Sequence, residues 1–511
     1  MPDFQNSIAT SYTFKGASVL LGGAIHDLNP IEGLQIRVPL KTLNRHGLIA
    51  GATGTGKTKS LQVLLEELSL AGVPSLVMDI KGDLSGIGAP GTRNPIVTRR
   101  EASIQMQWKE MGFPVEFLTI SEEPGARIRS TVSEFGPVIM GKILNLNDTQ
   151  EGVLGMLFKF ADDHKLPLLN LEDLKSLLRY SVEDGKADIQ KEYGLVSSPS
   201  VHSILRNVTA LEQQGAQRLF GEPSFDVMDL CATDRYGHGM VNIIRLTDIQ
   251  SKPQLFSAFM LSLLAEVFEV FPEAGDSVAP KLMIFIDEAH LLFREASKDL
   301  LNQIDIIIKL IRSKGIGIIF ITQTPDDIPE NILGQLGFKL QHALRAFTAK
   351  DRKAINLLAD NFPETSFYDT KKLLTEMGIG EALVTVLNEK GMPTELAHTL
   401  MRPPFSRMDV LTDQEISNIL GFSRLCSKYN QELDRHSAHE MLMERINEAT
   451  AEKELTQTGK NSKMKRPVPP PSADVSFEKI MKSPLANTIA RELTRGILGV
   501  FGISTSRRRR R

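Results

Sequence analysis

The chain has 511 residues, of which 41% are apolar and 24% are charged, and its formal net charge is −3. This length predicts two or three domains, and the charge excludes a basic field over the whole molecule of the kind that announces nucleic-acid binding. Two cysteines, Cys231 and Cys426, lie far apart without metal-ligand spacing, which favours a reducing compartment. The first ten residues are polar and no apolar run approaches the ~20 residues of a membrane span, so we expect a cytoplasmic, soluble protein that does not span a membrane.

Residues 1–30 form an N-terminal segment whose structure the pattern leaves open. Residues 18–23 are compatible with a strand that ends in a turn. Residues 36–40 alternate like an edge strand, a place that suits Pro39 because proline donates no ladder hydrogen bond.

Residues 51–58, Gly-Ala-Thr-Gly-Thr-Gly-Lys-Thr, match G-x-x-x-x-G-K-[ST] at every fixed position. A short buried strand precedes them and an amphipathic helix follows, which is the context of a phosphate-binding P-loop. Lys57 would reach the β- and γ-phosphates, and the Thr58 hydroxyl would bind Mg²⁺. Backbone N–H groups of the loop and the helix N-terminus would hold the phosphates of ATP. The predicted nucleotide-binding residues are Gly51, Ala52, Thr53, Gly54, Thr55, Gly56, Lys57, Thr58 and Lys59.

A second buried strand at 75–79 ends in Asp79-Ile-Lys-Gly-Asp83. The carboxyl ends of strands hold the ligand in an open α/β sheet, so Asp79 or Asp83 is a candidate for a place near the metal or its waters. The alternative is a capped loop. Residues 115–120 predict a third strand.

Residues 121–237 have the apolar spacing of several helices and predict a helical insertion. Asn170 predicts the start of one of them, because asparagine is a preferred helix N-cap. The simpler interpretation of the apolar stripes is a packed core. A lid that contacts a partner or a substrate is the alternative.

The α/β pattern resumes at residue 239, and a strand at 281–286 runs directly into Asp287 and Glu288, the Walker B pattern. Asp287 would hold Mg²⁺ through water, and Glu288 would orient and polarise the attacking water. The alternative is an acidic helix N-cap. The insertion accounts for the long separation of Thr58 from Asp287.

A helix at 291–312 and a buried strand at 315–322 follow, and Gln323 stands at the tip of that strand. Gln323 would sense the γ-phosphate or the attacking water, unless it is only a polar strand end. Arg312 either complements the dipole of its helix or serves as an arginine finger to the ATP of a neighbouring subunit.

The last third of the chain changes character. Strands and a helix continue to Arg402, which closes the α/β domain. Residues 406–460 predict a polar helical extension, 461–475 a proline-rich basic linker, and 476–511 a short apolar helix with an arginine-rich tail. That tail would dock on the core, or bind DNA, RNA or an anionic membrane surface.

Four segments together carry a family resemblance, namely residues 44–58, 78–83, 285–290 and 312–325. The chain resembles the HerA/FtsK superfamily of P-loop ATPases, and within it the bacterial HerA-like, YjgR-type ATPases. The resemblance implies a RecA-like sheet flanked by helices over 31–120 and 238–405, ATP and Mg²⁺ as cofactors, and a hexameric ring that pumps DNA. It also implies Glu288 as the catalytic carboxylate, Gln323 as a sensor and Arg312 as the finger acting between subunits.

This chain departs from that family in three respects. HerA-type translocases carry an N-terminal β-barrel, whereas 50 residues precede Gly51 here. FtsK-like membrane segments and a C-terminal winged-helix signature are not recognised.

Three functions fit a P-loop. The first is an ATP-hydrolysing ring motor on DNA, of the helicase or translocase type; the second is an ATP-driven switch or assembly factor that acts on protein partners without nucleic acid. The third, a small-molecule kinase, is disfavoured because a carboxylate beside the metal aspartate suits water activation. A GTPase is disfavoured because the chain has no Asn-Lys-x-Asp segment.

Overall fold

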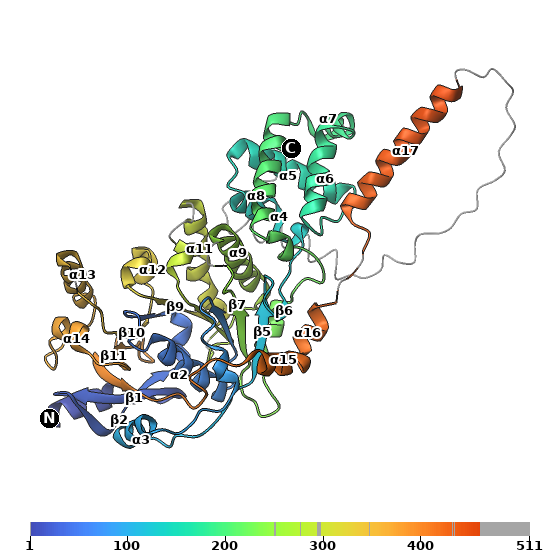
Figure 1. Ribbon diagram of the computed structural model, residues 1–511. Coiled ribbons are helices and arrows are strands. Elements are labelled where there is room, and N and C mark those ends of the chain that lie inside the picture. The colour runs from blue at the N-terminus through green and yellow to red at the C-terminus, as the bar shows by residue number, and fades with distance from the viewer. Residues whose placement is uncertain are drawn as a thin grey trace. The chain divides into compact units, whose positions relative to one another are not determined.

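The computed structural model describes residues 2–459, except 250–251, 276, 294–297, 347, 432 and 434. The chain forms two compact units (Figure 1). The first combines Met1–Ile128 with Phe225–Gln431, and the second combines Arg129–Ser224 with Glu432–Arg511. The predicted linker at 461–475 and the predicted helix and tail at 476–511 lie outside the described residues.

In its described residues, the first unit carries one sheet of 12 strands in the order β2-β1-β12-β11-β10-β3-β9-β8-β4-β7-β5-β6. Every neighbouring pair from β10 across to β6 is parallel. The pairs from β10 out to β2 are antiparallel. The strands are β1 Ser18–His26, β2 Asn29–Pro39, β3 Gly47–Ala50, β4 Ser75–Asp79, β5 Val115–Thr119, β6 Ala126–Arg127, β7 Val241–Arg245, β8 Leu282–Ile286, β9 Ile316–Thr322, β10 Phe338–His342, β11 Glu381–Thr385 and β12 Ala397–Met401.

The parallel register brings four chain segments to one edge of this sheet. Ala50 of β3 pairs with Thr322 of β9. On the far side of β9, Ile286 of β8 pairs with Phe320, and Met78 of β4 pairs with Ile286. The strands run in the same direction, so the residues that follow β3, β9, β8 and β4 emerge side by side. This edge is where an open α/β sheet binds its ligand.

Helices cover the sheet of the first unit. The apolar face of α2, which includes Leu61 and Leu65, shares a core with alternate strand residues such as Ile49 and Phe285. Two others, α9 and α11, pack against each other. The parallel-dominated sheet with flanking helices confirms the predicted α/β class. These helices are α1 Pro2–Ser11, α2 Lys57–Leu70, α3 Pro95–Ile104, α9 Pro253–Val270, α10 His290–Phe293, α11 Lys298–Ile311, α12 Glu330–Leu333, α13 Ala349–Ala359, α14 Thr370–Glu376, α15 Asp413–Gly421 and α16 Arg424–Tyr429.

The second unit is helical. Its helix α6 contacts α5, α7, α8 and α17. Asn170 caps α6, because its side chain accepts a hydrogen bond from the Asp173 N–H at 3.1 Å and Asp173 caps the Asn170 N–H in return. The helices are α4 Val132–Ile143, α5 Asp148–Asp163, α6 Leu171–Val182, α7 Lys186–Tyr193, α8 Ser198–Gln213 and α17 Ala438–Gly459. Across the described part of the chain, none of the helices combines the length and the apolar character needed to cross a membrane.

The units divide the chain differently from the predicted domain boundaries. The predicted N-terminal segment, residues 1–30, supplies α1, β1 and the first two residues of β2. It belongs to the first unit, because β1 pairs with β12 from the far end of that unit. The helical part spans 129–224 rather than 121–237, since β6 still pairs with β5. The extension at 406–460 divides between the units, with α15 and α16 in the first and α17 in the second. The pairing of β1 with β12 joins segments far apart in the sequence, and no local pattern predicts it.

A buried charge cluster fixes α2 to the end of the sheet. Arg402 is completely buried, with its guanidinium 2.9 Å from Glu66 and 3.1 Å from Glu67. Glu66 also accepts hydrogen bonds from the N–H groups of Phe405 and Ser406. The C-terminal half of α2 is therefore held by the segment that follows β12.

Arg402→Met is expected to lower the free energy of unfolding by about 3–5 kcal/mol, because removing one member of a buried ion pair leaves uncompensated charge. Urea denaturation of both proteins measures the change. The double variant Arg402→Met with Glu66→Gln should recover part of the loss. A loss below about 1 kcal/mol in the single variant would show that Glu66 is not held by charge.

Candidate nucleotide-hydrolysis site

Close neighbours require glycine at two fixed positions of the P-loop. Gly51 and Gly56 have φ angles of 152° and 116°. A Cβ atom at Gly51 would lie 2.5 Å from Cβ of His342, and one at Gly56 would lie 3.2 Å from the backbone of Gly380. The Ala52 N–H donates to the carbonyl after β10, and the Gly380 N–H donates to the Thr55 carbonyl, each at 2.9 Å. The tips of β10 and β11 thus hold the loop in its curved shape.

Lys57 begins α2 and is buried. Its Nζ donates to the carbonyls of Gly51 at 2.6 Å and Ala52 at 3.1 Å, so the ammonium lies across its own loop. Burial and the charge of Lys81 lower the pKa of Lys57, while Glu288 and Asp287 oppose them. The carboxylates of Asp287 and Glu288 therefore act electrostatically on Lys57.

Asp79 and Asp83 have different surroundings. The Thr58 hydroxyl donates to Oδ2 of Asp83 at 3.2 Å, and within the described residues no hydrogen bond reaches Oδ1 of Asp83, which is buried. The oxygens of Asp79 accept from the N–H groups of Gly82 and Leu84 at 2.8 and 3.3 Å. Asp83 is therefore the carboxylate beside the predicted metal ligand Thr58, while Asp79 shapes the loop as a cap.

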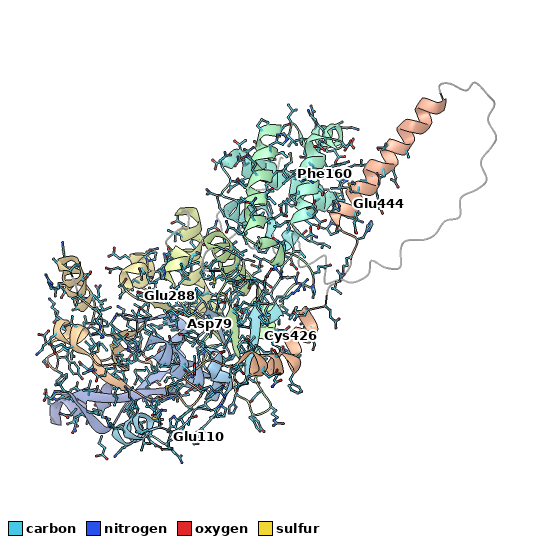
Figure 2. The ribbon with its side chains drawn as sticks, in the orientation of Figure 1. Asp79, Glu110, Phe160, Glu288, Cys426 and Glu444 are labelled. Atoms are coloured by element: carbon cyan, nitrogen blue, oxygen red, sulfur yellow. The ribbon has the colours of Figure 1, made fainter. Side chains whose placement is uncertain are left out.

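Asp287 and Glu288 follow β8 and are 4% and 7% exposed. Glu288 has φ +46°, a conformation that costs a non-glycine residue of order 1–3 kcal/mol and is concentrated at functional sites. The Lys81 ammonium forms an ion pair with Oε1 of Glu288 and lies 3.8 Å from Oδ2 of Asp287. Figure 2 labels Glu288 and Asp79 in this part of the first unit.

The other oxygen of Glu288 has an unusual environment. His290 Nδ1 lies 3.2 Å from Oε2, but not in hydrogen-bonding geometry, so Oε2 is buried without a hydrogen bond among the described residues. A buried carboxylate oxygen left in this way is suited to accept a proton or a hydrogen bond from a bound molecule.

The polar atoms at this edge fit Mg²⁺. Thr58, Asp83 and Asp287 offer only oxygen donors, which Mg²⁺ prefers, and one of them is the unpaired Oδ1 of Asp83. The described residues contain no cluster of three His, Cys, Asp or Glu side chains in metal-binding geometry. Mg²⁺ usually takes one or two protein carboxylates and completes its shell with phosphates and waters.

Burial raises the pKa values of two of these carboxyl groups. Burial, together with Asp83, raises the pKa of Asp79 to about 6. Burial also raises the pKa of Asp287 to about 6, although the Lys81 charge opposes it. A divalent cation at this edge would favour the ionised forms.

Asp79→Asn is expected to change how stability depends on pH. The folded-state pKa of Asp79 lies above its ordinary value of 3.8, so its contribution is full below pH 4 and is lost as the pH rises through about 6. This difference corresponds to about 3 kcal/mol at most. Chemical denaturation in the absence of Mg²⁺ should show wild type losing stability relative to Asp79→Asn between pH 4 and 7. Parallel pH curves would contradict the raised pKa.

Two of the predicted catalytic residues lie at opposite ends of β9. Gln323 is exposed and follows Thr322, the register partner of Ala50, so it stands at the P-loop edge. Arg312 is exposed and begins a 3₁₀ turn before β9. The seven residues of β9 span roughly 20 Å. Arg312 is therefore remote from the P-loop of its own chain.

Lys59 and Lys81 also differ from the sequence-based interpretation. The predicted nucleotide-binding residue Lys59 directs its ammonium to the Met408 carbonyl, so only its backbone N–H remains for a phosphate. The sequence motifs assign no role to Lys81. A signal was present, since Lys81 follows β4 by two residues and every neighbouring strand tip carries a polar residue.

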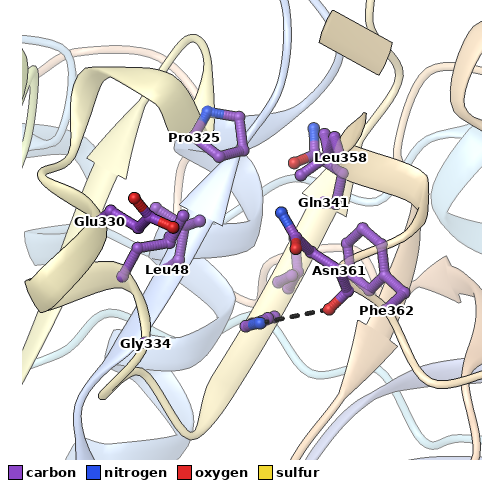
Figure 3. A pocket seen from close by; sticks show the side chains of 11 residues that line it. Leu48, Pro325, Glu330, Gly334, Gln341, Leu358, Asn361 and Phe362 are labelled. Carbon is purple, nitrogen blue, oxygen red and sulfur yellow. Dashed lines mark hydrogen bonds between the residues drawn. The ribbon is translucent and has the colours of Figure 1, made fainter. Parts of the chain in front are cut away.

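A cavity of about 210 Å³ lies on the sheet nearby, against β3 and β10 (Figure 3). Leu48 and Gln341 line it from these strands, and Nζ of Lys339 donates to the Asn361 carbonyl at 3.5 Å. None of the P-loop residues that the structure describes lines this cavity. It is therefore distinct from the phosphate cradle.

This site combines a P-loop, a hydroxyl and carboxylates suited to a metal, and the buried Glu288, which follows β8. These features define a P-loop nucleoside triphosphatase of the RecA-like class. The chain belongs to the helicase HerA-like C-terminal family, whose model matches residues 26–509. It is accordingly an ATP-hydrolysing P-loop enzyme, as the resemblance of its motifs implied.

Two curated relatives are named for their action on DNA. The chain is 22% identical over 390 residues to the DNA double-strand break repair helicase HerA of Sulfolobus acidocaldarius, covering 75% of this chain and 70% of that protein. It is 25% identical over 379 residues to the DNA import protein CedB of the same organism, covering 73% of this chain and 54% of CedB. The chain thus spans between about half and seven tenths of these relatives.

Solved structures support the fold. The bacterial conjugative coupling protein TrwBdeltaN70 matches with a TM-score of 0.52 at 13% identity, over 80% of this chain and 95% of that chain. TrwB in complex with a non-hydrolysable ATP analogue matches with a TM-score of 0.51 at 13% identity, over 78% and 99%. At this identity the likeness concerns the fold alone.

Proposed function

We propose that this chain is an ATP-driven motor of the helicase or translocase type that acts on DNA as a ring of identical subunits in the cytoplasm. The observation that carries the proposal is the meeting of Lys57, Asp287 and Glu288 at one sheet edge. Membership of the HerA-like family and relatives named as a DNA repair helicase and a DNA import protein support DNA as the substrate. Six subunits would be the expected ring size.

The geometry supports a direct mechanism of hydrolysis. Backbone N–H groups of the P-loop and Lys57 bind the phosphates, and Thr58, Asp83 and Asp287 would hold Mg²⁺. When bound, Mg²⁺ neutralises charge on the β- and γ-phosphates. Glu288 orients a water and accepts its proton while the water oxygen bonds to the γ-phosphorus. The bond from the γ-phosphorus to the bridging oxygen breaks, and ADP leaves with that electron pair. Gln323 would hold the water or the γ-phosphate from β9.

Arg312 would complete this site from a neighbouring subunit. Its guanidinium is exposed at the edge of the sheet opposite its own P-loop. An arginine supplied to the γ-phosphate from outside stabilises transition-state charge and is typically worth 10³–10⁵ in turnover.

Mixed rings test this assignment. Arg312→Ala and Glu288→Gln proteins should each hydrolyse ATP poorly, but mixing them is expected to restore part of the turnover. In such rings an intact Glu288 site can receive Arg312 from its Glu288→Gln neighbour. Arg206→Ala, at an exposed arginine of α8, is the control and should keep full activity. If verified mixed rings show no rescue, Arg312 does not act between subunits.

The function itself is tested by ATP turnover with and without single- and double-stranded DNA, beside a native mass measurement. The motor proposal expects an oligomer whose turnover rises with DNA, and whose stimulation weakens steeply with salt because phosphate contacts release counterions. An active ATPase with no response to DNA at any salt concentration would instead favour the switch or assembly factor that acts on proteins.

A further inference from the structure

Lys81 contacts both carboxylates on which the hydrolysis mechanism depends. It lies in the loop after β4, and its ammonium pairs with Oε1 of Glu288 and lies 3.8 Å from Oδ2 of Asp287. The side chains of Glu288 and Asp287 are 9% and 6% exposed, whereas that of Lys81 is 38% exposed. The acidic side of the contact is fixed inside the protein, while the lysine reaches it from the solvent side and has room to move.

Two buried carboxylates need a positive partner, because an unpaired buried charge is costly. In the structure Lys81 is that partner. A Mg²⁺ ion held by Asp287, directly or through water, would place a second cation within a few ångströms of this ammonium. Like charges at that separation repel strongly in a buried site. The Lys81 ammonium and a metal ion would therefore compete for the same carboxylates.

The contact also constrains Glu288 itself. Because the Lys81 ammonium occupies Oε1, the orientation of the Glu288 carboxylate is set by that lysine rather than by a water. Lys57 lies within electrostatic range of Lys81 and of both carboxylates. Two ammonium groups thus lie within electrostatic range of each other, one on the P-loop and one on the carboxylates that follow β8.

We propose that Lys81 is a mobile counter-ion, which holds Glu288 and Asp287 in the nucleotide-free site and transfers to the γ-phosphate when the magnesium nucleotide binds. The transfer releases Glu288 for the attacking water, so Lys81 couples nucleotide binding to the activation of hydrolysis. This inference rests on the proposed ATP site.

The first test needs no turnover. Thermal unfolding of wild type and Lys81→Met is measured without nucleotide, with and without MgCl₂. Lys81→Met should unfold at a lower temperature without metal and gain roughly 2–4 °C or more from Mg²⁺, whereas wild type should gain little. Lys81→Gln, which keeps a hydrogen-bond donor but no charge, should behave in the same way and serves if Lys81→Met folds poorly. Equal Mg²⁺ shifts in wild type and both variants would overturn the counter-ion role.

The second test concerns the γ-phosphate. Affinities for a non-hydrolysable ATP analogue and for ADP are measured by titration in the presence of Mg²⁺. Loss of Lys81 should weaken binding of the analogue about tenfold relative to ADP, and Lys81→Arg should restore part of the preference. An unchanged ratio would overturn the transfer.

A matched control separates these effects from the general loss of a lysine. Lys142 pairs with Glu151 at 2.8 Å in the second unit. Lys142→Met should change neither the Mg²⁺ shift nor the nucleotide ratio. If wild type bound neither nucleotide, the proposed function would fail. If wild type binds both and the Lys81 variants match it, only the role of Lys81 fails.

Discussion

Glu288→Gln is expected to bind ATP with an affinity within about threefold of wild type and to hydrolyse it 10²–10⁴ times more slowly, the usual contribution of a general base. The amide nearly preserves the shape of the side chain, and Oε1 can still accept from Lys81. It cannot take a proton from water, so the chemical step fails while the phosphate cradle remains. Single-turnover hydrolysis and equilibrium nucleotide titration measure the two effects separately.

Glu151→Gln is the control for that experiment, since Glu151 also pairs with a lysine but lies in the helical unit. Its turnover should equal that of wild type. Wild-type turnover in Glu288→Gln would reject Glu288 as the base, whatever the strain of its backbone implies.

Lys57→Ala is expected to weaken ATP and ADP binding by about 100-fold or more and to abolish measurable turnover. Each charge-assisted contact to a phosphate is worth roughly 1.5–3 kcal/mol, and Lys57 would make more than one. The change also removes the hydrogen bonds from Nζ to the Gly51 and Ala52 carbonyls, which brace the loop.

Lys309→Ala provides the comparison, because Lys309 is an exposed lysine on α11 that pairs with Asp305. It should bind nucleotide as wild type does. Tight ATP binding by a correctly folded Lys57→Ala protein would contradict the assignment of the P-loop as the nucleotide site.

The sequence predicts well the parts of this site that local chemistry determines. The strand, loop and helix around Lys57 and the strand that ends at Asp287 lie where their patterns place them. A Cβ atom at position 51 or 56 would lie within a few ångströms of neighbouring atoms, so glycine is required at both positions of the motif because the loop is closely packed. The α/β class follows from the same alternation of buried strands and amphipathic helices.

The parts that depend on tertiary contacts are absent from the local pattern. Whether Asp79 or Asp83 is the carboxylate near the predicted metal site depends on tertiary and loop contacts. N–H groups of the loop donate to both oxygens of Asp79, whereas Asp83 accepts from the Thr58 hydroxyl. The ion pair of Lys81 with Glu288 joins two strand tips far apart in the chain, and the left-handed backbone at Glu288 has no residue signature. The joining of β1 to β12 likewise depends on a pairing across nearly the whole first unit.

One measurement tests the central claim most directly, namely an experimental structure of the Glu288→Gln protein with Mg²⁺ and ATP. We expect the side chain at position 288 to lie one water molecule from the γ-phosphorus, with Thr58 and Asp287 at the metal and Lys57 on the β- and γ-phosphates. A nucleotide bound in the cradle with position 288 turned away, and no water between it and the γ-phosphate, would contradict hydrolysis at this sheet edge.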